Sequence, residues 1–425
     1  MNPIRRIKGT QDILPGESEK WTALEQVIRR QMKLYNYNEI RTPVFESTDL
    51  FARGIGELTD IVSKEMYTFL DRSQKSVTLK PEMTAPVMRA YIENNLQAQA
   101  PLSKLFYIAA LFRQERPQAG RLRQFNQFGA ECIGSPLPQA DAETILLALD
   151  IFNDLGLRGL ELRINSVGDA QCREPYKKIL QKYLRKEINN PTEDVKNRIQ
   201  NNPLRVLDSK DPNLQQVIED APKLIDHLNE ISEEHFRTVK EILQEQNIIF
   251  VIDPTLVRGL DYYTHVVYEI TSSGLGAQNA LCGGGRYDLL SKEIGGRDIP
   301  AVGFAAGMER ILMALESQDS TPAKTEAPDV FIVALGQAAV KAAPSWLKKL
   351  RENKLSADTD FLGRSIKAQF REANRQQVRF VIVLGDEEMS KKMLSLKDMQ
   401  TGEQQDVAFN EVIEKLKGLK TKSEK

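Results

Sequence analysis

Cysteine and histidine are scarce in this chain, which has three of each among its 425 residues. The cysteines, Cys132, Cys172 and Cys282, lie far apart in the sequence, and the histidines are scattered. A disulfide framework or a structural zinc site needs such residues in larger sets and at short spacing. The sequence therefore predicts neither a disulfide-stapled protein nor a Cys/His metal site.

Long apolar runs are also missing. No stretch of about 18 apolar residues occurs, which is the length that a membrane-spanning helix requires. The first residues, MNPIRR, are not followed by an apolar segment of the secretory-signal type. We therefore expect no membrane span and a cytoplasmic protein. The formal net charge of −1 gives no overall signal for nucleic-acid binding.

The composition and length of the chain predict several soluble domains. The chain is 41% hydrophobic and 28% charged, and its length exceeds one ordinary core. Residues 321–328 have the composition of a linker, and beyond them short apolar strands alternate with helices, which predicts a small α/β domain at 329–425. Within residues 1–320, the stretch at about 171–247 is charged and helix-forming, includes the run NPLRVLD, and has the character of an insertion.

One predicted helix near the end of the chain carries a basic stripe. Arg364, Lys367, Arg371 and Arg375 share a face at helical spacing. A solvated helix surface explains such a stripe, and so does a surface that faces phosphates.

A central β-hairpin organises the first part of the chain. The apolar run Leu105 to Phe112 predicts a buried strand, residues 113–123 a polar turn, and Gln124 to Glu131 a returning strand. Because strand side chains alternate between faces, one face of the returning strand carries Phe125, Gln127, Gly129 and Glu131.

That face has the features of a ligand pocket. The ring of Phe125 can cover an adenine, the bare Gly129 can make room for a ligand, and Gln127 with Glu131 can accept hydrogen bonds from a cationic one. Arg113, at the end of the first strand, can grip a phosphate with two donors. A solvated hairpin with chance alternation is the alternative, but this combination of side chains favours a pocket.

Two further segments carry candidate site residues. Glu82 and Thr84 can accept hydrogen bonds from an ammonium group, or Thr84 can be the N-cap of a helix that begins at Ala85. Tyr262 and Tyr263 are adjacent at the head of a strand, so we expect at most one of them on a given pocket wall. Tyr263 is expected to place its hydroxyl near a polar ligand, while Tyr262 packs against the pocket or borders it.

Three more features leave alternatives open. Arg258 is either a surface arginine or a cation of the site. Residues 282–288, CGGGRYD, predict a glycine-rich turn without the spacing of a phosphate-binding loop, in which the glycines allow close approach of a ligand or of another strand. Arg310 lies on a predicted helix after an apolar strand and either points across the sheet or forms a surface ion pair.

Together these segments resemble the class II aminoacyl-tRNA synthetases and, among them, the histidyl-tRNA synthetase family. The resemblance covers nearly the whole chain in the expected order. Ile40 to Phe45 resembles motif 1, Phe112 to Glu131 motif 2, and Val302 to Leu312 motif 3. The most specific piece is Arg258 to Tyr263, RGLDYY, which resembles the histidine-specific signature.

The resemblance implies an α+β fold and an ATP-dependent ligase. Residues 1–320 form a catalytic domain with an antiparallel sheet flanked by helices and a helical insertion at about 171–247, and 329–425 form an anticodon-binding α/β domain. Histidine reacts with ATP to give histidyl-adenylate and pyrophosphate, and the histidyl group then passes to the 3′ end of tRNA(His). The implied partners are L-histidine, ATP with Mg²⁺, tRNA(His) and a second copy of the chain in a homodimer, with no organic cofactor and no zinc.

The resemblance also implies a role for each candidate residue. The catalytic cations are Arg113 and Arg258. Histidine is bound by Glu82, Thr84, Gln127, Glu131, Tyr262 and Tyr263. ATP is bound by Arg113, Glu115, Arg121, Phe125 and Arg310. The tRNA acceptor end is met by Arg116, Gln118 and Arg123.

The chain departs from the family at Met83, where a glycine is usual, and this side chain must point away from the histidine or narrow its pocket.

Two other functions compete with the synthetase. One is a catalytically silent histidine sensor like the regulatory subunit of ATP phosphoribosyltransferase, but such paralogues typically lose the arginines and the terminal domain that this chain keeps. The other, a nucleic-acid-binding module without chemistry, leaves the pocket residues unexplained.

Overall fold

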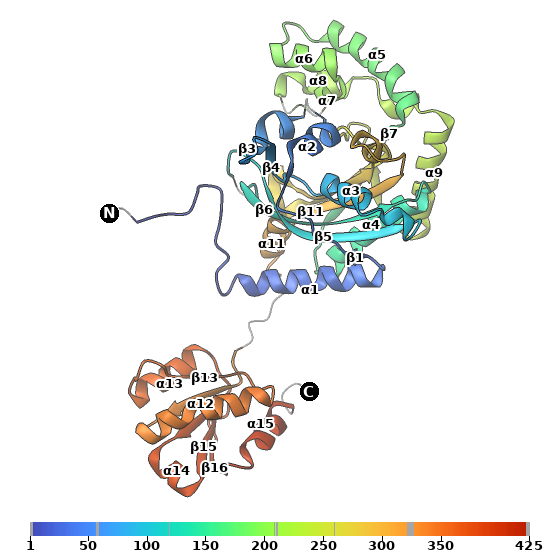
Figure 1. Cartoon of the computed structure of the whole chain (residues 1–425). Coiled ribbons are helices and arrows are strands. Elements are labelled where there is room, and N and C mark those ends of the chain that lie inside the picture. The colour runs from blue at the N-terminus through green and yellow to red at the C-terminus, as the bar shows by residue number, and fades with distance from the viewer. Residues whose placement is uncertain are drawn as a thin grey trace. The chain divides into compact units, whose positions relative to one another are not determined.

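The computed structural model describes residues 3–56, 59–118, 120–207, 209, 211–258, 260–320 and 327–421. The chain divides into two compact units, Met1–Ala323 and Lys324–Lys425 (Figure 1). Most of the predicted linker at 321–328 lies outside the described residues.

An eight-stranded sheet forms the centre of the first unit, in the order β1-β5-β6-β11-β10-β9-β7-β8. All neighbours are antiparallel except the outer pairs β1–β5 and β7–β8, which are parallel. The predicted α+β class with an antiparallel-rich sheet is confirmed. The strands are β1 (Asn38–Glu39), β5 (Ser103–Phe112), β6 (Gln124–Ile133), β7 (Leu160–Gly168), β8 (Phe250–Ile252), β9 (Thr264–Ser272), β10 (Ala280–Arg286) and β11 (Ala301–Gly307).

The predicted hairpin is confirmed as β5 and β6, which pair without a break from Ser103–Ile133 to Phe112–Gln124. The prediction of a turn at residues 282–288 is wrong. Residues 280–286 form β10, which lies between β9 and β11 in the sheet interior. A run of glycines favours a turn when read locally, but here both neighbouring strands bind its backbone.

Two apolar clusters cover the two faces of this sheet. One contains Phe128 and Ala130 of β6 with helices α1 (Ser18–Leu34), α4 (Pro138–Asp154), α9 (Glu230–Glu245) and α11 (Met308–Ser317). The other contains Tyr107 and Leu111 of β5 with helices α3 (Thr84–Glu93) and α5 (Ala170–Glu187), and Phe125 packs against it. The alternation predicted for β6 is therefore present, and the candidate site lies on the second face.

The insertion between β7 and β8 is helical, as predicted. Its helices are α5, α6 (Glu193–Asn201), α7 (Leu204–Leu207), α8 (Gln215–Glu219) and α9, with short 3₁₀ turns at Pro212–Leu214 and Leu224–His227. Figure 1 shows α5 to α8, in green, together at one end of the first unit. A small antiparallel sheet of β2 (Phe45–Ser47), β4 (Ser76–Leu79) and β3 (Tyr67–Leu70) contacts helix α2 (Thr48–Ile55), which in turn contacts α3 and α10 (Leu290–Glu293). A five-residue π-helix, Ile61–Glu65, precedes β3.

The second unit is a five-stranded mixed sheet with helices, which confirms its α/β character. The strand order is β13-β12-β14-β15-β16, with β12 parallel to β13 and β14. The strands are β12 (Val330–Ala334), β13 (Ala357–Thr359), β14 (Phe380–Leu384), β15 (Met393–Asp398) and β16 (Gln404–Ala408), and the helices are α12 (Gln337–Glu352), α13 (Ile366–Arg375), α14 (Asp386–Lys391) and α15 (Val412–Thr421).

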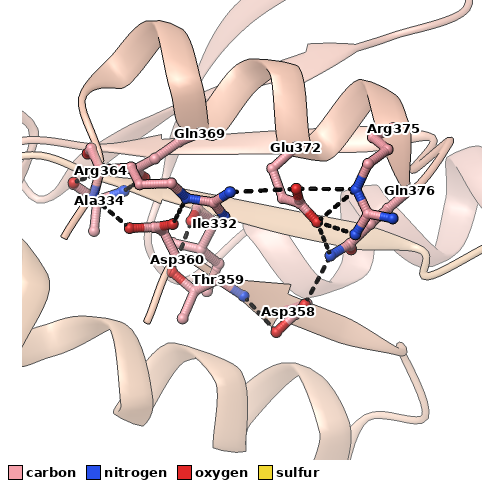
Figure 2. Close-up of polar contacts among 10 residues, drawn as sticks. All are labelled: Ile332, Ala334, Asp358, Thr359, Asp360, Arg364, Gln369, Glu372, Arg375 and Gln376. Atoms are coloured by element: carbon pink, nitrogen blue, oxygen red, sulfur yellow. Dashed lines mark hydrogen bonds and ion pairs between the residues drawn. The ribbon is translucent and has the colours of Figure 1, made fainter. Parts of the chain in front are cut away.

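The basic stripe near α13 is partly neutralised. Figure 2 shows Glu372 between two of its members, and its carboxylate accepts hydrogen bonds from Arg364, 3.3 Å away, and from Arg375. These bonds hold the pKa of Glu372 at about 2, with Arg375 the largest cause. Beside them Gln369 is buried and ties α13 to β12 through the backbone N–H and C=O of Ala334.

Candidate active site

Two cavities lie on the second face of the large sheet and share part of their walls. The larger has a volume of about 620 Å³ and the smaller about 90 Å³. Both are lined by Arg113, Gln127, Arg258, Leu260 and Gly283, which come from three separate parts of the chain. The cavities therefore adjoin, and the two predicted catalytic arginines stand where they meet.

Most of the predicted site residues line one cavity or the other. The larger cavity adds Glu115, Arg121, Phe125 and Arg310. The smaller adds Glu82, Thr84, Tyr262 and Tyr263, and also Met83 and Tyr287. Gly259 of the signature and Ala119 of the turn lie outside the described residues.

Arginine side chains at the larger cavity are held by protein oxygens. Arg113 donates through Nε to the carbonyl of Pro81 at 2.9 Å and lies over the ring of Phe125 at 5.3 Å. Arg310 donates to two carbonyls, at 3.1 Å and 2.9 Å, so it points across the sheet as one alternative expected. Burial, and then the nearby Arg121, lowers the pKa of Arg310. These cations are thus fixed in direction before any anion arrives.

Glu115 lies among these cations. Its carboxylate is 3.8 Å from Arg113 and 3.4 Å from Arg121, both loose ion-pair distances. A polyphosphate that enters the cavity can therefore compete for these guanidinium groups.

Arg258 is directed into the site by a carboxylate and by an absent side chain. Its guanidinium donates to Glu269 of β9 at 2.6 Å. It also passes over Gly283 of β10, where a Cβ atom would lie only 1.7 Å from one of its terminal nitrogens. The glycine run thus allows close approach of a protein side chain, that of Arg258, which itself faces the cavity. The two alternatives from the sequence were close approach of a ligand or of another strand, and neither of them describes this contact in full.

Glu82 caps helix α3. Its carboxylate accepts the backbone N–H groups of Thr84 and Ala85 at 2.7 Å and 2.9 Å. The alternative in which Thr84 is the N-cap is wrong, because the helix begins at Thr84 and its hydroxyl is used elsewhere. Burial raises the pKa of Glu82 to about 7, against the lowering effect of these hydrogen bonds.

Glu131 is buried behind the smaller cavity and accepts two hydroxyl groups. The donors are Thr84, at 2.9 Å, and Tyr287, at 2.5 Å, and both line the cavity. Burial raises the pKa of Glu131 to about 8, and the neighbouring Glu82 adds to this effect. A buried acid whose pKa lies near neutrality is a common feature of functional sites.

Tyr287 was missed from the sequence. It directly follows the glycine-rich strand β10, and its position after a strand that faces the pocket was the only local signal. Its contact with Glu131 joins residues 156 positions apart, so no local pattern announces it.

Two expectations about neighbouring side chains are wrong. The space beside Gly129 is not ligand space, because Tyr107 from the opposing strand fills it and its hydroxyl lies 2.3 Å from where a Cβ would be. Tyr262 and Tyr263 both line the smaller cavity, with ring centroids 4.8 Å apart. They precede β9, so strand alternation does not apply to them.

Met83 is buried and its sulfur lies 3.7 Å from the hydroxyl of Thr42. It also forms part of the wall of the smaller cavity, beside Glu82 and Thr84. The Met83 side chain therefore does not prevent Glu82 from capping α3 or Thr84 from donating to Glu131.

The predicted tRNA-contacting residues lie on the turn between β5 and β6. Gln118 and Arg121 exchange backbone hydrogen bonds at 3.1 Å and 2.9 Å, which makes this a tight turn. The backbone N–H of Arg123 donates to the carbonyl of Gly9 at 2.7 Å. Arg116 and Gln118 are exposed, so they are available to a large partner beside the cavity.

Two further observations concern metals and membranes. In the part of the chain that the structure describes, no group of three or more His, Cys, Asp or Glu side chains is placed to hold a metal ion. Over the same residues, no helix combines the length and the apolar character needed to cross a bilayer.

Comparison with known proteins gives consistent matches along the chain. The family model described as histidyl-tRNA synthetase matches residues 9–311, and that of an anticodon binding domain matches residues 329–419. A histidine–tRNA ligase of Chloroherpeton thalassium is 48% identical over 416 residues, which is 97% of each chain. One from a Geobacillus strain is 47% identical over 96% of this chain and 98% of its own.

Solved structures agree with these matches. The structure of apo histidyl-tRNA synthetase from S. aureus has a TM-score of 0.84 at 40% identity and covers 98% of this chain and all of that one. A Bacillus halodurans protein described as an ATP phosphoribosyltransferase regulatory subunit/histidyl-tRNA synthetase reaches a TM-score of 0.65 at 23% identity, over 90% of this chain and 99% of its own. At that identity the likeness concerns the fold alone.

Proposed function

The chain belongs to the histidyl-tRNA synthetase family and is a ligase that charges tRNA with histidine, and we propose that it activates the amino acid where its two cavities meet. The observation that carries this proposal is the wall that the cavities share. ATP occupies the larger cavity and histidine the smaller. Arg113 and Arg258 then stand between the carboxylate of one substrate and the α-phosphate of the other.

The reaction needs no protein nucleophile. The histidine carboxylate attacks the α-phosphate, pyrophosphate leaves, and a ribose hydroxyl at the tRNA 3′ end later displaces AMP from the adenylate. Catalysis then comes from alignment and from neutralising charge on phosphorus. Arg113 holds the α-phosphate, and Arg258 bridges it to the histidine carboxylate. The fixed directions of both side chains support this assignment.

The smaller cavity recognises histidine through polar groups that, apart from the half-buried Gln127, are already buried. Glu82, Thr84 and Gln127 receive the ammonium group, while Glu131 and Tyr263 bond the imidazole ring, with Tyr262 at the border. An amino acid without ring nitrogens could not form the hydrogen bonds offered by Glu131 and Tyr263, and a hydrogen bond to a charged group contributes about 1.5–3 kcal/mol. This supports selection of histidine without an editing step.

The larger cavity holds the nucleotide. Phe125 stacks on adenine, and Arg310 with Arg121 meets the outer phosphates. Magnesium arrives with the ATP, since this ion is usually bound by substrate phosphates and one or two carboxylates. Glu115 fits that role, because its carboxylate faces the cavity and its ion pairs are loose. The ion would neutralise phosphate charge.

The tRNA meets the chain at two places. Arg116, Gln118 and Arg123 on the hairpin turn contact the acceptor end, and residues 329–425 bind the anticodon as a separate domain. The exposure of Arg116 and Gln118 beside the cavity supports the first part, and the family match of residues 329–419 supports the second.

The active form is a homodimer in the cytoplasm. Val44, Phe45, Phe69 and Leu70 are about half exposed and gather at the small sheet of β2, β3 and β4. Exposed apolar groups of this kind mark protein interfaces. Light scattering should give twice the mass of the chain, and Phe45→Asp with Leu70→Asp should give the monomer.

ATP–pyrophosphate exchange with each of the twenty amino acids tests the activation site. Exchange with histidine alone is expected. Arg258→Ala should lose exchange while histidine binding, measured by calorimetry, persists. Histidine binding without exchange in the wild-type chain would contradict the synthetase and favour the sensor.

A further inference from the structure

The helical insertion holds the loop that carries the histidine signature. Asp261 lies in that loop between Leu260 and Tyr262, both of which line the smaller cavity. Its carboxylate accepts hydrogen bonds from Asn202 at 3.0 Å and from two nitrogens of Arg205, at 3.2 Å and 2.9 Å. Asn202 and Arg205 belong to the run NPLRVLD, to which the activation chemistry assigns no part.

A second arginine of the insertion holds the same loop two residues further on. Arg173, near the start of α5, donates from its guanidinium to the backbone carbonyl of Tyr263 at 2.6 Å. The two contacts thus lie on either side of Tyr262. The first part of the chain also holds the loop, since the N–H of Asp261 donates to the carbonyl of Ile55 at 3.2 Å.

The insertion also reaches the larger cavity directly. Leu207, Ser209 and Gln215 form part of its wall, and Leu207 ends the helix that carries Arg205. A displacement of this helix would therefore move the wall of one cavity and, through Asp261, the tyrosines of the other.

We propose that Arg205 and Arg173 are positioning residues for amino acid activation. They act through Asp261 and the Tyr263 carbonyl and hold Tyr262, Tyr263 and Arg258 in the geometry that histidine requires. This inference rests on the proposed roles of those three loop residues. The insertion is then part of the activation machinery, although it supplies no group to the reacting atoms.

The test compares Arg205→Ala, Asp261→Asn and the double variant in pyrophosphate exchange, with histidine and ATP varied separately. If Arg205 and Asp261 act through one contact, each single change raises the KM for histidine about tenfold. The KM of the double variant is then no higher than that of the more impaired single variant. The KM for ATP changes less than the KM for histidine. Arg205→Lys keeps the charge and is expected to restore part of the loss.

Arg185→Ala is the matched control. Arg185 also lies in the insertion and donates to the side chain of Gln200 at 2.7 Å, but both partners are exposed and lie outside the walls of the cavities. Its KM for histidine should equal that of the wild type. Melting temperatures of all variants separate loss of positioning from loss of folding.

Four outcomes count against the inference. An unchanged KM for histidine in Arg205→Ala and Asp261→Asn overturns it, and so does an equal rise in Arg185→Ala, which would mean a general loosening of the insertion. If Arg205→Ala does not fold, an unchanged KM in Arg205→Lys and Asp261→Asn overturns it. Absence of histidine exchange in the wild type would instead refute the activation site itself, and this inference with it.

Discussion

Gly283→Ala should inactivate the enzyme without unfolding it. The new Cβ would lie 1.7 Å from a terminal nitrogen of Arg258, 2.1 Å from its central guanidinium carbon and 2.5 Å from the other nitrogen. A carbon–nitrogen contact needs about 3.5 Å, so the guanidinium must move by about 1.5–2 Å. That movement also breaks its 2.6 Å hydrogen bond with Glu269.

The size of the effect follows from this displacement. A misplacement of about 1 Å among the groups that position the reactants lowers the rate about a hundredfold. The kcat for pyrophosphate exchange should therefore fall by at least that factor, which corresponds to a rise of about 2.7 kcal/mol in the activation free energy. The clash is with the end of a flexible side chain, and Gly283 has no positive φ, so the backbone tolerates alanine. The melting temperature should stay within a few degrees of the wild type.

The measurement is exchange at saturating histidine and ATP, beside thermal unfolding. Gly418→Ala is the control, because it lies in helix α15 of the second unit and the Cβ that it would add has no contact within 4 Å among the described residues. That variant should retain activity within about threefold, since the new methyl group requires no displacement. A folded Gly283→Ala enzyme with near-normal exchange would show that the position of Arg258 does not matter to the reaction.

Further predictions concern the histidine pocket and the terminal unit. Tyr287→Phe removes one of two donors to buried Glu131 and should raise the KM for histidine about tenfold with little change for ATP; equal effects on both substrates would contradict the assignment. Because the pKa values of Glu82 and Glu131 are raised to about 7 and about 8, lower pH protonates both carboxylates. The kcat/KM for histidine should therefore fall as the pH is lowered from about 8.5 to about 6.5, and a flat profile would argue against ionised acceptors. Gln369→Ala leaves the Ala334 backbone groups unpaired and should destabilise the second unit by about 1–3 kcal/mol in urea unfolding while pyrophosphate exchange is kept.

Local patterns in the sequence were sufficient for the hairpin and for its pocket-facing side. An apolar run, a charged turn and an alternating return predict β5 and β6, because each of these signals arises from neighbouring residues. The same is true of the helical insertion, whose composition marks it before any fold is known. Local reading failed at the glycine run of β10, since a glycine's preference for turns gives way when strands on both sides bind its backbone.

The sequence by itself thus determined the central hairpin, the helical character of the insertion and the side chains that face one side of the returning strand. Only the tertiary structure decided what those side chains touch. Tyr287 reaches Glu131, Arg258 passes over Gly283, and Arg205 holds Asp261 because β10, β6 and the insertion meet around one loop. Such contacts depend on the register and order of strands far apart in the chain, and short-range periodicity carries no information about them.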